Sequence, residues 1–394
     1  MNDWNLFNDI KNIILFYKMK IVFVTPAYRP SFHNEGKGGG EISNQILMQG
    51  LSKKKNRVLI LSMLPVIQKT VYRDGHVIVV ELGMVFWTNS LGIILSMFFF
   101  RTMLARFLKR ITPDIVIAST STVKVAGKVS REQGVPVGAM VRAMENLPGY
   151  GWDWSKTSIR DIVKYLSHRF SIGWPGGSEI DEVDFIISNS EFLCKKYLQS
   201  YPEKENFTVY PPLDIVRSSA SLPSKIKKVM MVGTTKDKGF DIFCNVAKCF
   251  PQLEFHAIGD RSLTGGDTRV VDGVVVHGWI YDPIPFVDTM DLVLVPSICE
   301  EAFGRIAVEA LCRKKFVLVS SQGGLPEAVG RQDNLIVKAN DTNCWVEKIN
   351  DFVENNNKYK CSTFKAIKLT RQFTIKNQAE GFISYLKKIE LYFK

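Results

Sequence analysis

Residues 292–311, LVLVPSICEEAFGRIAVEAL, contain a strand, a loop and a helix in that order. The strand is Leu292–Val295, a run of apolar and β-branched residues of the kind found in buried parallel sheets. The helix is expected to begin near Phe303. A strand that leads through a short loop into a helix is the repeating unit of an α/β fold, and the rest of the chain repeats it.

Short apolar runs alternate with helical or loop segments along the chain, in two successive series. The first series comprises residues 20–25, 57–62, 77–81, 114–118 and 135–141, and the second comprises residues 228–232, 253–258, 274–277, 292–295 and 316–319. Each series predicts a mostly parallel sheet covered by helices. The sequence therefore predicts an α/β protein with two Rossmann-like domains, one for each series.

The two predicted domains are separated by a segment rich in proline and serine. Pro211 and Pro212 precede the run Ser218-Ser219-Ala220-Ser221, so the boundary is expected between residues 211 and 224. The first domain then covers residues 19–214 and the second covers residues 215–372. Residues 1–18 are predicted to form an amphipathic extension helix, and residues 373–394 a terminal amphipathic helix.

The positive charge of the chain is concentrated near its start. The 394 residues carry a formal net charge of +12, and residues 1–130 hold 17 basic and 7 acidic side chains. We therefore expect an anionic partner for the first domain. Nucleic acid is not expected, because the basic residues form no recognisable nucleic-acid-binding module. The absence of a secretory signal and an odd count of seven cysteines indicate reduced thiols and a cytoplasmic protein.

Residues 82–100 carry no charge and end in three consecutive phenylalanines, Phe98 to Phe100. Four basic residues follow within the next ten positions: Arg101, Arg106, Lys109 and Arg110. A membrane span is disfavoured because the run is short, holds polar residues and lies between two predicted strands of one sheet. Two interpretations stay open, a helix that docks onto anionic lipid and a buried core helix with a solvated basic end.

Several nucleotide-binding motifs are missing from the sequence. The glycine-rich run 36–40 has Glu41 where a dinucleotide-binding fingerprint requires its last glycine, and no Walker A run occurs. An Asp-x-Asp pair, which would hold a divalent ion on a diphosphate, is also absent. Any bound diphosphate must therefore be neutralised by lysine, arginine or helix N-termini, and no metal or other cofactor is expected.

Groups of that kind follow the first strand of each predicted sheet. Gly39 and Gly40 open an apolar helix, where bare backbone N–H groups can approach a phosphate or a sugar. The run 233–239, GTTKDKG, places Lys236 and Lys238 at the carboxyl edge of the second sheet, where ligands of open α/β sheets bind. A plain tight turn and solvated loop lysines would give the same two patterns.

The strongest constellation is a pair of glutamates eight positions apart, Glu301 and Glu309, with Phe303 and Gly304 between them. The first N–H groups of the helix would face a phosphate. Glu309 would lie on a face able to accept hydrogen bonds from ribose hydroxyls, and Glu301 would reach a transferred sugar. A helix with one capping and one solvated glutamate remains the alternative.

These residues together resemble the retaining GT-B glycosyltransferases of family 4, the group 1 glycosyl transferases. The E-x7-E motif matches at Glu301 and Glu309, and residues 323–327 (GGLPE) are similar to the family's G-G-x-P-E loop. Residues 210–214 (YPPLD) resemble its interdomain signature, and residues 113–116 (PDIV) a first-domain strand. The resemblance covers nearly the whole chain from Met19.

The resemblance implies a metal-independent hexosyl transfer from a nucleotide-diphosphate sugar to an acceptor hydroxyl, with retention of configuration, in a cleft between two domains. It implies that Glu301, Lys238 and Gly40 act in catalysis. It further implies a donor site formed by Gly39, Gly40, Thr234, Lys236, Lys238, Ile280, Glu301, Phe303, Gly304, Arg305, Ile306 and Glu309. The terminal helix 373–394 would cross back to the first domain, and the second domain would bind the donor.

The sequence departs from the family pattern at two places. Thr234 stands where the family usually has an arginine beside the lysine on the diphosphate; Lys236 is a possible substitute, although it offers only a point charge. Arg142 is nearest to the position of a histidine often found in the first domain, so Arg142 and Glu145 become acceptor-side candidates. A GT-B epimerase and a donor-binding protein with weak or no transferase activity remain the alternatives.

The expected partners follow from this resemblance and from the charge distribution. The donor would be linked to UDP, GDP or dTDP, and the acceptor would be a saccharide or a lipid-linked saccharide in polysaccharide, lipopolysaccharide or glycolipid assembly. The basic first domain favours attachment to an anionic membrane, so the protein is expected in the cytoplasm or peripherally on the inner face of the cell membrane.

Overall fold

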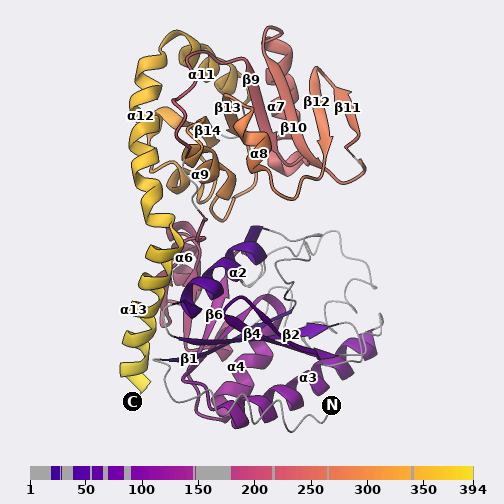
Figure 1. The fold of residues 1–394 in the computed structure, drawn as a ribbon, viewed down its shortest axis with the longest axis vertical. Coiled ribbons are helices and arrows are strands. Elements are labelled where there is room, and N and C mark those ends of the chain that lie inside the picture. The colour runs from indigo at the N-terminus through magenta and orange to yellow at the C-terminus, as the bar shows by residue number, and fades with distance from the viewer. Residues whose placement is uncertain are drawn as a thin grey trace. The chain divides into compact units, whose positions relative to one another are not determined.

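The computed structural model describes residues 19–26, 28, 39–53, 56–64, 70–83, 90–144, 147, 179–214, 218–263, 266–338 and 341–393. The chain forms two compact units, each with its own sheet (Figure 1). The first unit comprises Met1–Asn189, Cys194–Val209 and Gln378–Lys394, and the second comprises Ser190–Leu193 and Tyr210–Asn377. The predicted α/β class with two Rossmann-like domains is confirmed.

The first unit contains an eight-stranded sheet with the order β3-β4-β2-β1-β5-β6-β7-β8. Its neighbouring strands run parallel except for the β3–β4 pair. The strands are β1 Lys20–Thr25, β2 Arg57–Leu64, β3 Thr70–Asp74, β4 Val77–Gly83, β5 Ile115–Ser119, β6 Val137–Val141, β7 Phe185–Ser188 and β8 Glu205–Thr208. The helices are α2 Gly39–Ser52, α3 Ser90–Ile111, α4 Val123–Glu132, α6 Glu191–Ser200 and α13 Ile375–Phe393.

The second unit contains a seven-stranded sheet with the order β11-β12-β10-β9-β13-β14-β15, in which only β11 is antiparallel to its neighbour. The strands are β9 Lys228–Val232, β10 Glu254–Asp260, β11 Thr268–Val271, β12 Val274–Gly278, β13 Leu292–Val295, β14 Phe316–Ser320 and β15 Ile336–Val337. The helices are α7 Phe240–Cys249, α8 Ile284–Asp288, α9 Arg305–Cys312, α10 Leu325–Ala328, α11 Thr342–Glu354 and α12 Asn356–Leu369.

Each sheet is central to a buried apolar core, as expected for strands covered on both faces. In the first unit, α13 contributes Phe382, whose ring stacks on Phe23 of β1 with 6.2 Å between centroids. In the second unit, Phe316 of β14 packs edge-to-face on Phe352 of α11, and Trp345 of the same helix is fully buried. The terminal segment therefore completes the first core, although the stretch just before it, Tyr210–Asn377, belongs to the second unit.

The observed division between the units differs from the predicted boundary. The second unit begins again at Tyr210 instead of residue 215. The Tyr210 ring packs on Phe303 and Phe373 at centroid distances of 5.4 and 5.1 Å, and the Leu213 N–H donates to the Phe373 carbonyl at 2.9 Å. These contacts anchor the proline segment in the second core. Phe373 itself lies in a short 3-10 turn, and α13 starts just after it at Ile375. The part of α13 that belongs to the first unit begins at Gln378.

Five strands were not predicted: β3, β7, β8, β11 and β15. They are two to five residues long, and β3, β8, β11 and β15 lie at sheet edges, where alternation and burial are weakest. The predicted extension helix 1–18 lies outside the described residues. Within the described part of the chain, no helix is both long and apolar enough to cross a membrane.

The stretch 82–100 falls in two elements. Leu82 lies in β4, and Phe98 to Phe100 lie in α3. Phe98 and Phe99 are 63% and 61% exposed, whereas Phe100 is fully buried. At the described end of this run, one side of the helix is buried, as the core-helix interpretation predicts, and the other side faces solvent, which leaves the lipid-docking interpretation a prediction.

Candidate functional site

The predicted donor residues of the second unit lie in loops and a helix that follow the carboxyl ends of its strands. Strands β9 and β13 are parallel neighbours, so the loops that follow them leave the sheet side by side. The carbonyl oxygen of Asp237, in the loop after β9, accepts hydrogen bonds from the N–H groups of Ile298 (2.9 Å) and Cys299 (3.2 Å) in the loop after β13. These two bonds fix the two loops against each other and hold their side chains in register.

Lys238 and Glu301 form an ion pair between these loops. The Lys238 Nζ donates to the Glu301 Oε1 at 2.5 Å, and the Ser297 hydroxyl donates to the same oxygen at 2.7 Å. Burial alone would lower the pKa of Lys238, but the adjacent Glu301 carboxylate outweighs it and raises the pKa above its usual range. Lys238 is therefore a fixed cation at neutral pH. The sequence gave no signal for Ser297, because a single serine four residues before a glutamate matches no motif.

The residue after Lys238, Gly239, adopts a left-handed backbone conformation. Gly239 has φ of 79°, and a Cβ there would lie 1.9 Å from the Pro296 carbonyl oxygen. Only glycine fits this position without displacing the backbone. The other residues predicted in this loop are Thr234, which is half-buried, and Lys236, which is exposed.

The second glutamate, Glu309, is held by an arginine of its own helix. Helix α9 begins at Arg305 and not near Phe303, because Gly304 adopts φ of 92° and breaks the helical path just before it. Arg305 Nη2 donates to Glu309 Oε1 at 2.8 Å, four residues later on the same face. Arginine at the first position of a helix lies beside the positive end of the helix dipole, so this edge concentrates positive charge.

Phe303 and Ile306 contribute backbone and packing to the site, and their side chains lie in or against the second core. Phe303 is 2% exposed and packs on Phe373 with 5.1 Å between centroids, while Ile306 is partly buried. Any contact of Phe303 with a ligand must therefore use its backbone.

The G-G-x-P-E loop braces the turn that carries Glu301. The Gly324 N–H donates to the Glu301 carbonyl at 2.7 Å. Gly323 has φ of 61°, and a Cβ there would lie 2.2 Å from the same carbonyl oxygen. The buried Glu327 carboxylate accepts hydrogen bonds from the N–H groups of Glu191 (2.8 Å) and Phe192 (2.7 Å). Sequence reasoning named this loop by resemblance, but its support of Glu301 is visible only in three dimensions.

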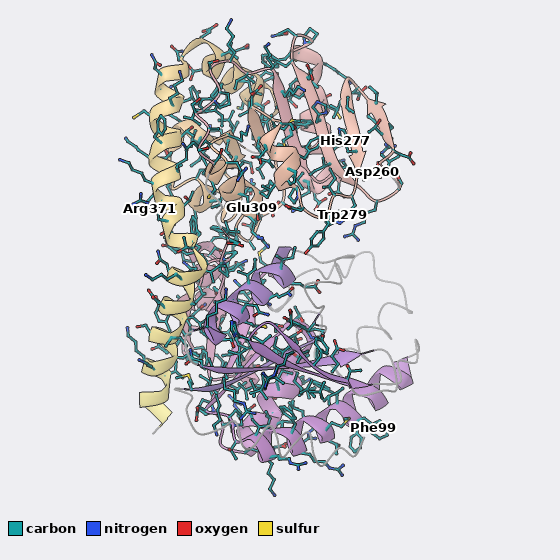
Figure 2. All side chains as sticks on the ribbon, in the orientation of Figure 1. Phe99, Asp260, His277, Trp279, Glu309 and Arg371 are labelled. Carbon is teal, nitrogen blue, oxygen red and sulfur yellow. The ribbon has the colours of Figure 1, made fainter. Side chains whose placement is uncertain are left out.

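Ile280 follows β12 at the same edge of the second sheet, beside an exposed aromatic side chain. Trp279 is 45% exposed, and the Arg261 guanidinium lies 5.0 Å from its ring centroid. Figure 2 shows Trp279 and Glu309 at the same edge of the second unit. Ile280 itself is partly buried against the second core. A planar ring with a cation beside it offers a surface on which a flat ring such as a nucleobase could stack.

The first-unit candidates form a second, separate cluster. Helix α2 begins at Gly39, and a Cβ on Gly40 would lie 3.4 Å from the Arg142 Cβ, at the end of β6. The Arg142 guanidinium donates to the Asn44 side chain (2.7 Å) and to the Val209 carbonyl (3.2 Å). The structure thus brings Gly39, Gly40 and Arg142 together. Glu145 lies outside the described residues.

The described residues offer no cluster of three or more histidine, cysteine, aspartate or glutamate side chains that could hold a metal ion. None of the seven cysteines forms a disulfide. Two cationic groups on the described second edge, Lys238 and Arg305, are partly buried, and each is paired with a glutamate.

The segment of sequence that forms this edge matches a known protein family. Residues 226–355, from β9 to α11, match the family model of the glycosyl transferases group 1. The second unit carries a group 1 glycosyltransferase domain. This glycosyltransferase domain contains both glutamates of the E-x7-E motif, Lys238 and the G-G-x-P-E loop. The described site is therefore the part of the chain for which sequence relationship is demonstrable.

A curated relative also matches part of the chain. A segment of 155 residues is 28% identical to a Klebsiella pneumoniae protein described as an uncharacterized 42.6 kDa protein in the cps region. The match covers 37% of this chain and 40% of that relative.

Similar solved structures cover nearly the whole chain and have the GT-B fold. A sucrose-phosphate synthase from Thermosynechococcus elongatus matches with a TM-score of 0.71 and 15% identity over 94% of this chain and 99% of its own. Anabaena HepE, solved with UDP and glucose, matches with a TM-score of 0.63 and 18% identity over 94% and 100% of the two chains. The lipopolysaccharide outer core galactosyltransferase WaaB matches with a TM-score of 0.64 and 14% identity over 94% and 99%. At these identities the likeness establishes the fold of the glycosyltransferase domain and of the unit before it.

Proposed function

We propose that this protein is a glycosyltransferase that moves a hexose from a nucleotide-diphosphate sugar to an acceptor hydroxyl, with retention of the anomeric configuration and without a metal. The observation that carries the proposal is the pair of cation–glutamate contacts, Lys238–Glu301 and Arg305–Glu309, on either side of the Gly304 turn. Their position within a group 1 glycosyltransferase domain supports it.

In the proposed reaction, the bond between the sugar C1 and the diphosphate oxygen breaks, and a bond forms between C1 and the acceptor oxygen on the same face. The acceptor proton passes to the departing phosphate oxygen. Lys238 and the N-terminal N–H groups of α9 stabilise the negative charge that develops on the diphosphate. Because these groups are held by Glu301 and by the Gly304 turn before the donor arrives, they need little reorganisation during the reaction.

The roles of the carboxylates follow from their positions. Glu309, one turn into α9, would accept hydrogen bonds from the ribose hydroxyls while its contact with Arg305 holds the carboxylate in place. Glu301 would accept from a hydroxyl of the transferred hexose. Ile280 and the backbone from Phe303 to Ile306 would lie along the base and the phosphates. Gly39 and Gly40 would approach the diphosphate from the first unit, and Arg142 would serve the acceptor.

The donor is expected to be linked to UDP, GDP or dTDP. Anabaena HepE has been solved with UDP and with UDP-glucose, which favours a uridine donor as the first compound to test. The acceptor would be a saccharide or a lipid-linked saccharide, and the protein would act in the cytoplasm. A relative in the cps region and the structural likeness to a lipopolysaccharide galactosyltransferase support polysaccharide or lipopolysaccharide assembly as the pathway.

A thermal-shift panel of UDP-, GDP- and dTDP-sugars in the presence of EDTA tests the donor site. Wild-type protein is expected to be stabilised by sugars of one base, and Glu309→Ala is expected to lose that stabilisation. Lys314→Ala changes a half-buried lysine just after the same helix and is the matched control. No shift with any donor would contradict the proposed site.

Product analysis separates transfer from the alternatives. Isomerisation of the nucleotide sugar without any acceptor would identify an epimerase. Donor binding without transfer to any acceptor would identify a donor-binding protein, with Thr234→Arg as the variant expected to restore transfer. The anomeric coupling constant of the product, measured by NMR, decides between retention and inversion.

A further inference from the structure

The most exposed apolar side chains of the described first unit are Phe98 and Phe99 of α3, at 63% and 61%. Their rings contact each other edge-to-face with 6.2 Å between centroids. Figure 2 shows Phe99 on the outer side of α3. Adjacent phenylalanines on the outside of a soluble domain are unusual, because each leaves a large apolar ring in water. The pair therefore marks a surface on which something docks.

The rest of α3 explains why these rings are not drawn into the core. With 3.6 residues per turn, the buried positions Phe100, Leu104, Phe107, Leu108 and Ile111 occupy one arc of about 100°. Phe98 and Phe99 lie on the opposite side of the helix. The buried arc packs inside the first unit, where α3 contacts α4, so the phenylalanine pair lies on the exposed face of α3 and does not extend the core.

The exposed face of α3 also carries the basic residues of the helix. Arg106, Lys109 and Arg110 are exposed and fall with Phe98 and Phe99 within an arc of about 120°. At a rise of about 1.5 Å per residue, this stripe is about 18 Å long. The sequence of α3 contains no acidic residue. Arg101 lies beside the stripe and pairs with Glu132 of α4.

The stripe has two parts, an apolar pair and then a group of cations further along the helix. These two parts suit the apolar and the anionic layers of an anionic bilayer surface. Phenylalanine rings enter the boundary between headgroups and acyl chains, while arginine and lysine contact the phosphates. The excess of basic over acidic residues in residues 1–130 provides long-range attraction to the same surface. A protein partner would need a matching acidic groove, whereas a lipid surface supplies negative charge at any register along the stripe.

We infer that the α3 stripe, formed by Phe98, Phe99, Arg106, Lys109 and Arg110, docks the protein onto anionic lipid headgroups. The helix lies on the bilayer surface and does not span it, in agreement with the lack of a spanning helix in the described part of the chain. The interaction is independent of nucleotide-sugar chemistry. It places the first unit at the membrane whether or not the proposed transfer is correct.

Co-sedimentation of the full-length protein with vesicles tests this inference. The probes are vesicles of phosphatidylcholine alone and of phosphatidylcholine mixed with phosphatidylglycerol, at low and at physiological salt. Wild-type protein is expected to bind the mixed vesicles, to bind the neutral ones at least about tenfold more weakly, and to lose affinity as salt rises.

Two variants address the two parts of the stripe. Phe98→Ser with Phe99→Ser is expected to weaken binding about tenfold or more, and to leave the melting temperature unchanged because both rings are exposed. Arg106→Glu with Lys109→Glu is expected to abolish the preference for anionic vesicles. The second variant keeps the inference testable if the first one is unstable.

A matched control is available on the second unit. Phe364 is 50% exposed on α12 and precedes Lys365, so Phe364→Ser with Lys365→Glu changes the same residue types away from the α3 stripe. This control is expected to bind like wild type. Wild-type protein that ignores anionic vesicles, or α3 variants that bind as well as wild type, would overturn the inference. A change in oligomeric mass of the α3 variants without a change in vesicle binding would instead assign the stripe to a second copy of the chain.

Discussion

The carboxyl edges of the two sheets are built differently. The second edge holds two cation–carboxylate pairs, and its turns depend on Gly239, Gly304 and Gly323, each at positive φ. The described part of the first edge offers the helical glycines Gly39 and Gly40 and the Arg142 guanidinium, which is already bonded to Asn44. Both edges belong to the same kind of sheet, so features found at only one edge are not required by the fold and are candidates for ligand binding.

The contrast teaches that paired charges and turns that require glycine are concentrated where a polyanion is expected. Glycine adopts positive φ readily, and a Cβ on Gly239, Gly304 or Gly323 would lie within 2.4 Å of a neighbouring atom, so the second unit excludes other residues at three turns around the two ion pairs. In the described part of the first edge, a Cβ on Gly40 would lie 3.4 Å from the Arg142 Cβ, and the Arg142 guanidinium is engaged with the protein. We therefore expect substitutions at the second edge to abolish donor chemistry, and those at the first edge to act on stability or on the acceptor.

The largest effect is expected at Lys238. Lys238→Ala should lower the rate of transfer by about 10²- to 10³-fold, because it removes a preorganised cation from the departing diphosphate. Lys227→Ala changes an exposed lysine at the amino end of β9, away from the site, so it is the matched control and should change the rate by less than about threefold. Equal losses in both variants, measured as initial rates with saturating acceptor, would show that the ion pair with Glu301 has no special role.

The glycines provide the second contrast. Gly323→Ala should destabilise the protein by about 2–3 kcal/mol, because the new Cβ would meet the Glu301 carbonyl oxygen at a positive φ. Gly40→Ala meets only the Arg142 side chain at 3.4 Å and lies in a helix, so it should change stability by less than about 1 kcal/mol. Urea denaturation measures both. A folded Gly40→Ala that no longer transfers sugar would support a close backbone approach at that glycine.

The pairing of Arg305 with Glu309 predicts coupled effects on nucleotide binding. Arg305→Leu and Glu309→Ala should each weaken nucleoside diphosphate binding about tenfold, equivalent to about 1.4 kcal/mol. The double variant should be little weaker than either single one, because each substitution removes the same contact. Calorimetric titration with the nucleoside diphosphate checks this, and strictly additive losses would mean that the two side chains act separately.

At the first edge, Arg142→Ala is expected to reduce stability and to spare the donor. The loss of the bonds to Asn44 and to the Val209 carbonyl should cost about 1–2 kcal/mol. Donor-induced thermal shifts should keep their size, whereas the KM for the acceptor should rise. A donor shift that disappears in this variant would move Arg142 from the acceptor to the donor.

The smallest effect is expected from a histidine pair within the second sheet. His256 Nδ1 lies 3.1 Å from His277 Nε2, Phe286 packs on both rings, and Glu254 lies 3.9 Å from His256 Nε2. Burial lowers the pKa of both histidines below the ordinary value, and the neighbouring His277 adds to the effect on His256. Because the folded protein favours the neutral form of both histidines, their contribution to the free energy of unfolding is present above about pH 6.5. This contribution is lost as the pH falls below about 6.5.

Melting curves between pH 7.5 and pH 5 check this pH dependence. His256→Asn should flatten the fall in melting temperature below about pH 6.5, the ordinary pKa of histidine. His76→Asn changes a solvent-exposed histidine of the first unit and should leave the curve as in wild type. A curve that is unchanged in His256→Asn would remove the pair as the cause.

The sequence predicted the central strands closely and the edge strands poorly. β9 and β13 begin and end at the predicted residues, because four or five consecutive apolar residues are required where a strand is covered on both faces. β8 and β11 lie at or near sheet edges with mostly polar or exposed residues, and they carry no comparable pattern. The order of the strands could not be predicted, since it depends on which buried faces meet.

For the candidate site, the sequence motifs named the two glutamates, Lys238 and Gly304, all of which lie within residues 226–355, the segment that matches the group 1 glycosyl transferase model. They did not reveal the hydrogen bond from Ser297, the contact between Arg305 and Glu309, or the clash that demands glycine at position 323. Each of these depends on distances between loops that are far apart along the chain or on the point where a helix begins.

By itself, then, the sequence determined the class of fold, the division into two α/β units and the residue types at the second edge, because hydrophobic periodicity and motif spacing are local properties of the chain. The tertiary structure decided where the units divide, which cation meets which carboxylate, and which face of α3 remains in water. These are outcomes of packing: Tyr210 belongs to the unit whose aromatic rings it contacts, and Phe98 and Phe99 are exposed because Phe100 and its neighbours already fill the core.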